Sequence, residues 1–150
     1  MGRTDSDELQ KLIDGFAARI ARYVPFRMEF LPDVRQKGKP EVGRLQAAEA
    51  EKFRSALRPS DTVWLLDEKG KQPDSRGFAT QLQKAMNAGP KRLVLVIGGA
   101  YGFDPSLRER ADGSVSLSRM TFNHQVVRLM AVEQIYRGFS ILRGDPYHND

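Results

Sequence analysis

The sequence predicts an α/β fold with a mainly parallel sheet flanked by helices. Two runs of consecutive apolar residues, Val63–Leu66 and Leu93–Ile97, have the length of strands and lack the alternation of a half-exposed sheet. A segment of helical periodicity separates them, between Asp74 and the Gly89-Pro90 stop. Strand, helix and strand in this order are typical of parallel sheets, whose ligands bind at the carboxyl ends of the strands.

The N-terminal part predicts one helix and one short strand. Asp5 or Ser6 is expected to cap the helix, with Glu8 three residues after Asp5 as in a capping box. An apolar stripe at helical spacing follows, made of Leu9, Leu12, Ile13, Phe16, Ala17 and Ile20. Apolar and charged residues then alternate over 26–30, which predicts a strand exposed on one face.

The middle of the chain predicts loops and two further helices. Residues 32–44 have the composition of a polar loop, and a surface helix is expected over about 45–57. Residues 68–73 predict another loop, and Asp74 or Ser75 begins a helix with Phe78, Leu82, Ala85 and Met86 inward. A short strand is expected around Val115 and Leu117. The last helix, about 124–140, is apolar around more than half its girth, so it is either central or shared with a partner subunit.

Composition limits the class of protein. The 150 residues suit one domain, 1–150, and the net charge of +5 favours a polyanionic partner such as nucleic acid, or serves solubility alone. Cysteine is absent and the two histidines lie far apart, so no metal site is expected. The sequence contains no candidate membrane span and no signal peptide, which predicts a cytoplasmic protein without a membrane partner.

A glycine-rich turn follows the second strand. Gly98, Gly99 and Gly102 let the backbone approach a ligand closely, although three glycines after a strand are often only a tight turn. Their spacing is G-G-x-x-G and not the G-x-G-x-x-G of dinucleotide-binding proteins, which disfavours a Rossmann-like oxidoreductase. The parallel order places this turn and Leu66-Asp67 at one edge of the sheet.

Titratable side chains gather in the last quarter of the chain. His124 lies at the expected helix start, where a capping role is the simpler interpretation. Glu133 and Arg137 have the spacing of an ordinary surface ion pair. The tail ends in Pro146-Tyr147-His148, which supplies a stacking ring and a group that titrates near neutral pH. The basic loop with Arg35, Lys37, Lys39 and Arg44 is either a solvated loop or a phosphate contact.

Four motifs occur together and in order: 97–102 (IGGAYG), 117–125 (LSRMTFNHQ), 133–137 (EQIYR) and 146–148 (PYH). In this combination the chain resembles the RlmH family, pseudouridine N3-methyltransferases of large-subunit ribosomal RNA that belong to the SPOUT class. The resemblance implies a SPOUT-type α/β knot with a C-terminal trefoil knot. It also implies a homodimer that binds S-adenosylmethionine near the subunit interface and acts on the assembled ribosome.

The resemblance also assigns residues to roles. The cofactor pocket would consist of Leu66, Gly98, Gly99, Gly102, Leu117, Ser118, Arg119, Met120, Thr121 and Phe122. His148 and Tyr147 are the first candidates to accept or relay the proton of N3, and His124 is the second. Arg128 and Arg137 would hold phosphates or stabilise a developing anion.

The chain departs from the family pattern at its start. The family begins with a short apolar strand and a Gly-Lys-Thr-like turn; Gly2-Arg3-Thr4 matches the turn, but the strand is missing. Its absence would leave a neighbouring strand uncovered. The alternative function is a non-catalytic RNA- or ribosome-binding module of the same fold, which would keep the basic loop without transferring methyl groups.

Overall fold

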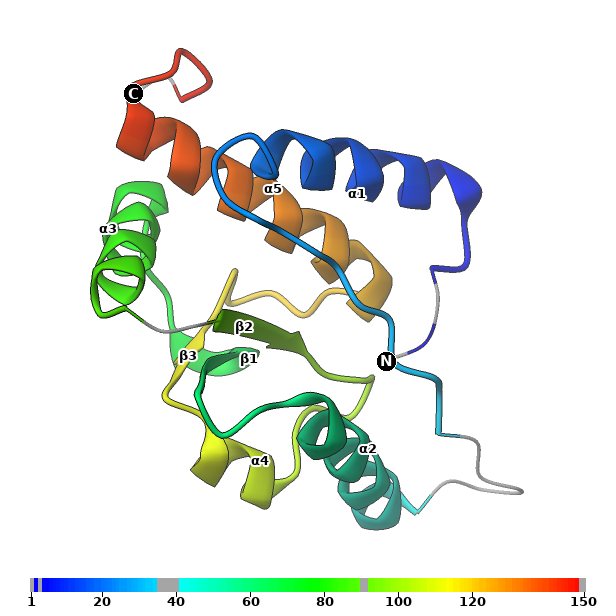
Figure 1. Ribbon diagram of the computed structural model, residues 1–150. Coiled ribbons are helices and arrows are strands. Elements are labelled where there is room, and N and C mark those ends of the chain that lie inside the picture. The colour runs from blue at the N-terminus through cyan, green and yellow to red at the C-terminus, as the bar shows by residue number, and fades with distance from the viewer. Residues whose placement is uncertain (1, 3, 35–40, 90–91, 149–150) are drawn as a thin grey trace.

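The computed structural model describes residues 2, 4–34, 41–89 and 92–148. Eight elements follow one another along the described chain, with a helix, α1 or α5, at each end (Figure 1). They are α1 (Asp7–Ile20), α2 (Val42–Ala56), β1 (Asp61–Lys71), α3 (Ser75–Asn87), β2 (Arg92–Ile97), α4 (Pro105–Arg110), β3 (Gly113–Val115) and α5 (His124–Arg143).

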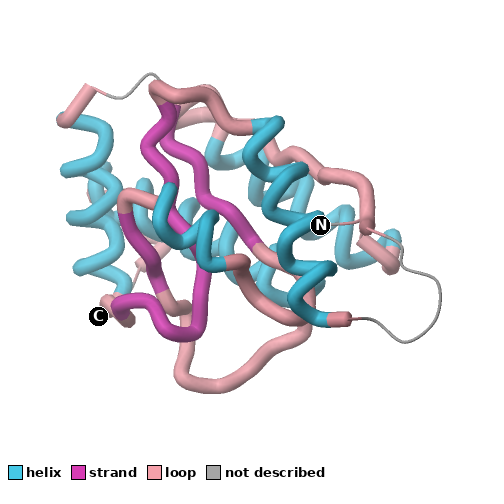
Figure 2. Tube along the Cα trace, turned by 90° about the horizontal axis from the view of Figure 1, so that it is seen from below, coloured by secondary structure: helices cyan, strands magenta, loops and turns pink. Residues whose placement is uncertain are grey.

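The strands form one parallel sheet in the order β2-β1-β3, which confirms the predicted α/β class. Helices α1 and α5 lie over one face, and α2 and α4 lie over the other (Figure 1). Viewed from the α2 and α4 side, the strands lie behind these two helices and in front of the others (Figure 2). The sheet therefore has a helical layer on each face, as its apolar strands require.

Alternation along β1 divides the apolar interior into two clusters. Val63 and Leu65 face α2 and α4, where they pack with Phe53 and Leu107. Leu66 faces the opposite layer, whose buried side chains come mainly from α1, α3 and α5: Ile13, Ile20, Phe78, Leu82, Ala131, Val132, Ile135 and Phe139. Because successive side chains of a strand point to opposite faces, one apolar run supplies both clusters.

Side-chain caps mark the starts of α1, α3, α4 and α5. The Ser6 hydroxyl accepts the Leu9 N–H at 3.2 Å, so Ser6 and not Asp5 caps α1. The Asp74 carboxylate accepts the Gly77 N–H at 2.6 Å. For α5 the cap is Asn123, and the capping role expected of His124 is wrong because His124 is the first helical residue.

Several predicted boundaries are wrong. β1 continues through the predicted loop to Lys71, whose carbonyl accepts the Ser116 N–H at 2.8 Å. Gly70 permits this pairing, because a Cβ there would lie 2.7 Å from the Val115 backbone. α2 begins three residues earlier than expected, and Leu117 lies outside β3.

The predicted strand over 26–30 is also absent. These residues are extended but belong to no helix or strand. Phe26 and Met28 still turn inward against the α5 side of the interior. The alternation therefore reports which side chains are buried, whereas a strand also needs a paired neighbour, and none lies beside this segment among the described residues.

The final helix, α5, lies at the centre of the fold of this one chain. α5 packs along both α1 and α3 as well as over the sheet. Gly138 allows the close approach to α3, because a Cβ there would lie 2.8 Å from Leu82 Cδ1. Gly144, with a φ of 72°, ends the helix in the left-handed conformation. Within the described residues, no helix has both the length and the apolar character needed to cross a membrane.

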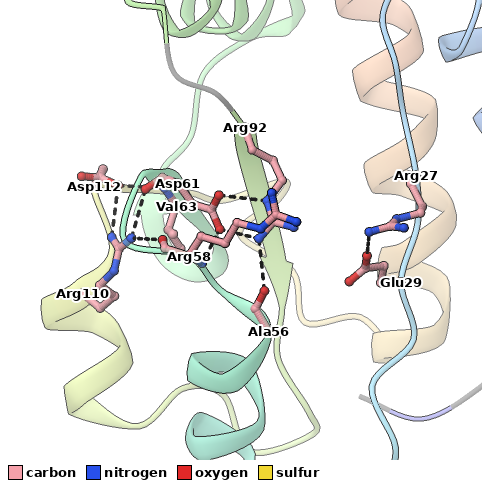
Figure 3. A network of polar contacts seen from close by, with 9 residues as sticks. All are labelled: Arg27, Glu29, Ala56, Arg58, Asp61, Val63, Arg92, Arg110 and Asp112. Atoms are coloured by element: carbon pink, nitrogen blue, oxygen red, sulfur yellow. Dashed lines mark hydrogen bonds and ion pairs between the residues drawn. The ribbon is translucent and has the colours of Figure 1, made fainter.

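A buried ion pair joins the starts of β1 and β2 (Figure 3). The Arg92 guanidinium donates to Asp61 Oδ1 at 2.9 Å and to the Ala56 carbonyl at 3.1 Å. The hydrogen bond from Arg92 lowers the pKa of the Asp61 carboxyl, although burial opposes the shift. Arg110 adds a bond to the Asp61 carbonyl at 3.0 Å, which ties α4 to the same corner.

Candidate cofactor site and C-terminal cluster

Two loops leave the carboxyl edge of the sheet on either side of Leu66, which lies within β1, five residues before its end. Leu66 of β1 lies opposite Ile97 of β2 on one side and opposite Val115 of β3 on the other. The glycine-rich turn begins directly after Ile97, and the loop 116–122 begins directly after Val115. The register therefore brings together the starting points of the segments that the sequence assigned to the cofactor.

The glycine-rich turn is tight and is held from α2. The Gly102 N–H donates to the Gly99 carbonyl at 3.2 Å, and Gly102 has a φ of 76°. The Glu49 carboxylate accepts a hydrogen bond from the Gly99 N–H, and burial raises the pKa of Glu49. Gln46 Nε2 donates to the Tyr101 carbonyl at 2.7 Å. Helix α2 thus contacts both ends of the turn.

Side chains at Gly98 and Gly99 would press on neighbouring groups. A Cβ at Gly99 would lie 2.5 Å from Glu49 Oε1, and one at Gly98 would lie 3.1 Å from the Phe103 ring. The sequence analysis missed Glu49 and Gln46, because a weakly amphipathic helix gives no sign of which polar side chains reach a distant loop.

The loop 116–122 is held by its own hydroxyl groups and exposes apolar side chains. The Ser116 hydroxyl donates to the Ser118 carbonyl at 2.8 Å, and the Ser118 hydroxyl accepts the Met120 N–H at 3.0 Å. Met120 is 70% exposed and Phe122 is 37% exposed. Exposed large apolar side chains on a loop at the carboxyl edge of the sheet are typical of a surface that binds a ligand or a partner.

A second cluster lies at the other end of α5. Glu133 Oε1 accepts bonds from Arg137 Nε at 3.0 Å, from Arg137 Nη2 at 2.6 Å and from the Tyr147 hydroxyl at 3.1 Å. The Arg137 guanidinium carbon lies 4.8 Å from the centre of the Tyr147 ring, and Arg137 Nη1 lies 3.3 Å from His148 Nδ1. Burial and the bond to Glu133 raise the pKa of Tyr147. The expected surface ion pair is therefore also the anchor of the C-terminal tail.

His124 and Arg128 do not join this cluster. They lie near the start of α5, and the 13 residues from His124 to Arg137 span ~20 Å of helix. Arg128 is 2% exposed, donates to Gln125 Oε1 at 2.8 Å and lies over the Phe30 ring. Burial lowers the pKa of both His124 and Arg128. The structure thus separates the five candidate catalytic residues into two groups.

A cavity lies elsewhere, between β2 and the extended segment 25–31. Its volume is about 400 Å³, and of the candidate residues it contacts only Leu66 and Arg128. The sequence analysis did not anticipate it, because the apolar run of β2 predicts a strand that is covered on both sides.

Parts of the predicted basic surface lie outside the described residues, namely Arg3, Arg35, Lys37 and Lys39. Arg44 is described; it is exposed and pairs with Glu41 at 2.9 Å. Within the described part of the chain, no group of three or more acidic, histidine or cysteine side chains is arranged to hold a metal ion.

Comparison with known proteins shows the family. A family model described as "Predicted SPOUT methyltransferase" matches residues 1–148. The chain belongs to this SPOUT methyltransferase family. It is similar to proteins named "Ribosomal RNA large subunit methyltransferase H". The protein of Flavobacterium johnsoniae is 47% identical over 149 residues, which are 99% of this chain and 95% of the relative. That of Parabacteroides distasonis is 42% identical over 150 residues, which are 100% and 96% of the two chains.

Membership in the SPOUT methyltransferase family indicates what kind of ligand the loops after β2 and β3 would bind. A SPOUT methyltransferase takes its methyl group from a donor, generally S-adenosylmethionine. The loops after β2 and β3 offer backbone groups at glycine and apolar side chains, which are the groups that hold an adenosyl ligand. The described features of this SPOUT methyltransferase therefore fit a methyl donor at the carboxyl edge of the sheet.

Proposed function

We propose that this SPOUT methyltransferase transfers a methyl group from S-adenosylmethionine to N3 of a pseudouridine in large-subunit ribosomal RNA, within the assembled ribosome. The observation that carries the proposal is the register that aligns Leu66, Ile97 and Val115, because it brings the loops after β2 and β3 to one edge of the sheet, on either side of Leu66. The names of relatives similar to the whole chain support the RNA substrate. The net charge of +5 suits a polyanion.

The residues proposed to hold S-adenosylmethionine are Leu66, Gly98, Gly99, Gly102 and those of the loop 117–122. Apolar side chains of this loop suit the adenine ring, and backbone groups at the glycines suit its polar atoms. When bound, S-adenosylmethionine supplies an electrophilic methyl group next to a sulfonium. The protein's task is then alignment, which contributes ~7 kcal/mol or more when two reactants are held in line.

We propose that the active unit is a homodimer in which the tail of one protomer completes the cofactor site of the other. Within one chain, Tyr147 and His148 lie at the far end of α5 from Asn123, which directly follows the loop 117–122. The tail contacts Glu133 and Arg137, which lie 10 and 14 residues after Asn123, so ~15–20 Å of helix separates these contacts from that loop. A tail held so firmly to its own helix cannot bridge this distance, whereas a partner's tail can.

In this proposal the tail handles the proton of the target base. N3 must lose its proton as the N–C bond forms, and the His148 imidazole offers a ring nitrogen that can accept it. Tyr147, whose raised pKa keeps the hydroxyl protonated, positions the tail through Glu133. Arg137 is positioned to stabilise the imide anion or a phosphate. His124 stays the second candidate, and the burial of Arg128 favours a structural role for it.

Two finer features of the fold belong to the same proposal. We propose that the C-terminal segment forms the trefoil knot of the SPOUT class, which would hold the glycine-rich turn and the loop 117–122 together. We also propose that the first strand of the family has no counterpart among the described residues, in which Gly2 already lies beside Leu31.

The decisive experiment measures methyl transfer on ribosomes. Large subunits from cells that lack the gene, incubated with the protein and S-adenosylmethionine, should gain one methyl group on a pseudouridine by mass spectrometry of the RNA. Isolated RNA should react poorly, and raising salt should weaken subunit binding steeply. Binding to ribosomes without methyl incorporation would instead establish the non-catalytic module. Thermal shift with the donor and with NAD separates both from an oxidoreductase.

A further inference from the structure

The C-terminal tail, residues 145–148, folds back along α5. The Tyr147 hydroxyl reaches Glu133, which lies about three helical turns before the end of α5. The bend of the tail is at Asp145, whose N–H donates to the Ser140 carbonyl at 2.9 Å and whose carbonyl accepts the Tyr147 N–H at 2.8 Å. The course of the tail therefore depends on how Asp145 is held.

The side chain of Asp145 is held from outside α5. The Tyr23 hydroxyl donates a hydrogen bond to the Asp145 carboxylate, although 122 positions separate the two residues in the sequence. Tyr23 lies in the turn that follows α1. The hydrogen bond to Asp145 raises the pKa of Tyr23 to about 12, so the phenol stays a hydrogen-bond donor throughout the neutral range. The bond thus joins the turn after α1 to the bend of the tail.

The Tyr23 ring is itself fixed by packing. It is stacked on the Phe139 ring, with centroids 5.7 Å apart and ring planes 12° apart, and its centroid lies 6.0 Å from that of Tyr136. The Tyr23 N–H donates to the Ile20 carbonyl at 2.9 Å. Both aromatic neighbours belong to α5, which lies along α1 (Figure 1). Because the ring is held on these sides, the hydroxyl sets the position of Asp145 and does not follow the tail.

Tyr136 connects the bend of the tail with its reactive end. The Tyr136 ring contacts Tyr23, and its centroid also lies 4.6 Å from that of Tyr147. Tyr147 is bound to Glu133 as well, and His148 follows it directly. The tail therefore has one anchor at its bend, from the turn after α1, and a second anchor next to the imidazole, from α5.

We propose that Tyr23 is a positioning residue for methyl transfer, because its hydrogen bond holds Asp145 at the bend and thereby sets where the His148 imidazole lies. This role for Tyr23 rests on the proposed function of the tail in the reaction. Tyr23 acts through Asp145 and supplies no proton and no charge to the target base. Alignment is the main task of the protein in this reaction, and a displacement of ~1 Å can cost ~100-fold in rate. Loss of one anchor of the tail is therefore expected to lower turnover.

The test removes a single oxygen atom. Tyr23→Phe keeps a ring that stacks on Phe139 and lacks the hydroxyl that binds Asp145. We expect kcat for methylation of large ribosomal subunits to fall ~10-fold, while KM for the subunits and the dissociation constant for S-adenosylmethionine stay within ~2-fold of the wild type. The amides of Asp145 and Tyr147 should exchange their hydrogens at least ~10-fold faster, because the bend opens more often.

Three further variants make the result specific. Asp145→Asn keeps a side-chain oxygen that can accept the Tyr23 hydroxyl, so it should retain most of kcat, whereas Asp145→Ala should lose as much as Tyr23→Phe. The double variant should lose no more than either single variant, because both changes remove the same bond. Thr80→Ala is the matched control: it removes an exposed hydroxyl bonded to the Arg76 carbonyl on α3 and should change neither kcat nor exchange in the tail.

The outcomes separate Tyr23 from the alternatives. Wild-type kcat in Tyr23→Phe would overturn the proposal, and so would a raised KM at unchanged kcat, which would indicate a contact with RNA. A lower kcat with unchanged exchange of the tail amides, or losses that multiply in the double variant, would overturn it as well. If the wild type transferred no methyl group, the proposed function would fail, and exchange in the tail would by itself decide whether Tyr23 holds the bend.

Discussion

The Tyr147 hydroxyl and the Glu133 carboxylate are joined by a hydrogen bond of 3.1 Å, at the oxygen that also accepts both bonds from Arg137. The Tyr147 ring also lies edge-on to the Tyr136 ring, with centroids 4.6 Å apart. The tail is therefore an ordered part of the molecule, although a terminal Pro-Tyr-His segment is usually mobile.

If this tail serves the reaction, removing its side chains should affect turnover and spare the cofactor. We expect His148→Ala and Tyr147→Ala to lower methylation of ribosomal subunits by ~100-fold, the usual contribution of a positioned proton acceptor. The dissociation constant for S-adenosylmethionine, measured by calorimetry, should stay near that of the wild type. Thr80→Ala, an exposed change on α3, is the control. Wild-type rates for both tail variants would contradict the assignment.

The glycine-rich turn should tolerate no side chain at Gly99. In Gly99→Ala the new Cβ would meet Glu49 Oε1 at 2.5 Å and displace the carboxylate that binds the turn. We expect cofactor affinity to fall by ~10-fold or more, since a loss of ~1.4 kcal/mol suffices. Gly43→Ala on α2, where a Cβ would meet no atom within 4 Å, should leave affinity unchanged. The proposed site would be in error if the two variants bound the donor equally.

Mixed dimers can test whether a site is shared between protomers. At donor concentrations below the wild-type dissociation constant, chains carrying Gly99→Ala alone should keep about a tenth of wild-type activity or less, and chains carrying His148→Ala alone about a hundredth. Co-expressed, they form mixed dimers in which one of the two sites has an intact turn and an intact tail. Random pairing restores roughly a quarter of wild-type activity. Failure to recover activity in confirmed mixed dimers would show that each chain uses its own tail.

Two helical glycines should respond to alanine in opposite ways. Gly138 of α5 lies against α3, and a Cβ there would be 2.8 Å from Leu82 Cδ1, so Gly138→Ala should destabilise by ~1–2 kcal/mol. Gly15 of α1 has open space around it, so Gly15→Ala should stabilise by ~0.5–1 kcal/mol through helix propensity. Urea unfolding at neutral pH measures both changes. A stabilised Gly138→Ala would mean that the helices separate without cost.

The Asp61–Arg92 pair should make stability depend on pH in the acid range. The pKa of Asp61 is lower in the folded chain, so the unfolded chain takes up the proton first as the pH falls. The pair's contribution is complete above the unfolded pKa of about 4 and is lost as the pH falls through the folded pKa. Asp61→Asn should therefore cost ~2–3 kcal/mol at pH 7 and less at pH 3, which lies below the unfolded pKa.

The matched control for this prediction is an exposed pair. Glu51→Gln breaks a contact with Arg54 in which the two side chains are 69% and 42% exposed. It should change the free energy of unfolding by less than ~0.5 kcal/mol at either pH. A cost for Asp61→Asn that does not vary with pH would assign its effect to packing alone.

The sequence by itself determined the parallel α/β class, the order of its main elements and the family. These follow from local patterns: apolar runs at 63–66 and 93–97, capping residues at 5–6 and 74–75, and ordered motifs that need no knowledge of contacts. The placement of Leu66 and the glycine-rich turn at one edge also followed, because parallel strands align their carboxyl ends.

Only the tertiary structure decided which groups meet across long stretches of chain. It brought the Glu49 carboxylate to the Gly99 N–H and divided the candidate catalytic residues into two groups along α5. It also left residues 26–30 without a strand partner, beside the cavity that borders β2. Local patterns record whether a side chain is buried. The identity of its neighbour depends on how distant segments pack, and that information is absent from any single stretch of sequence.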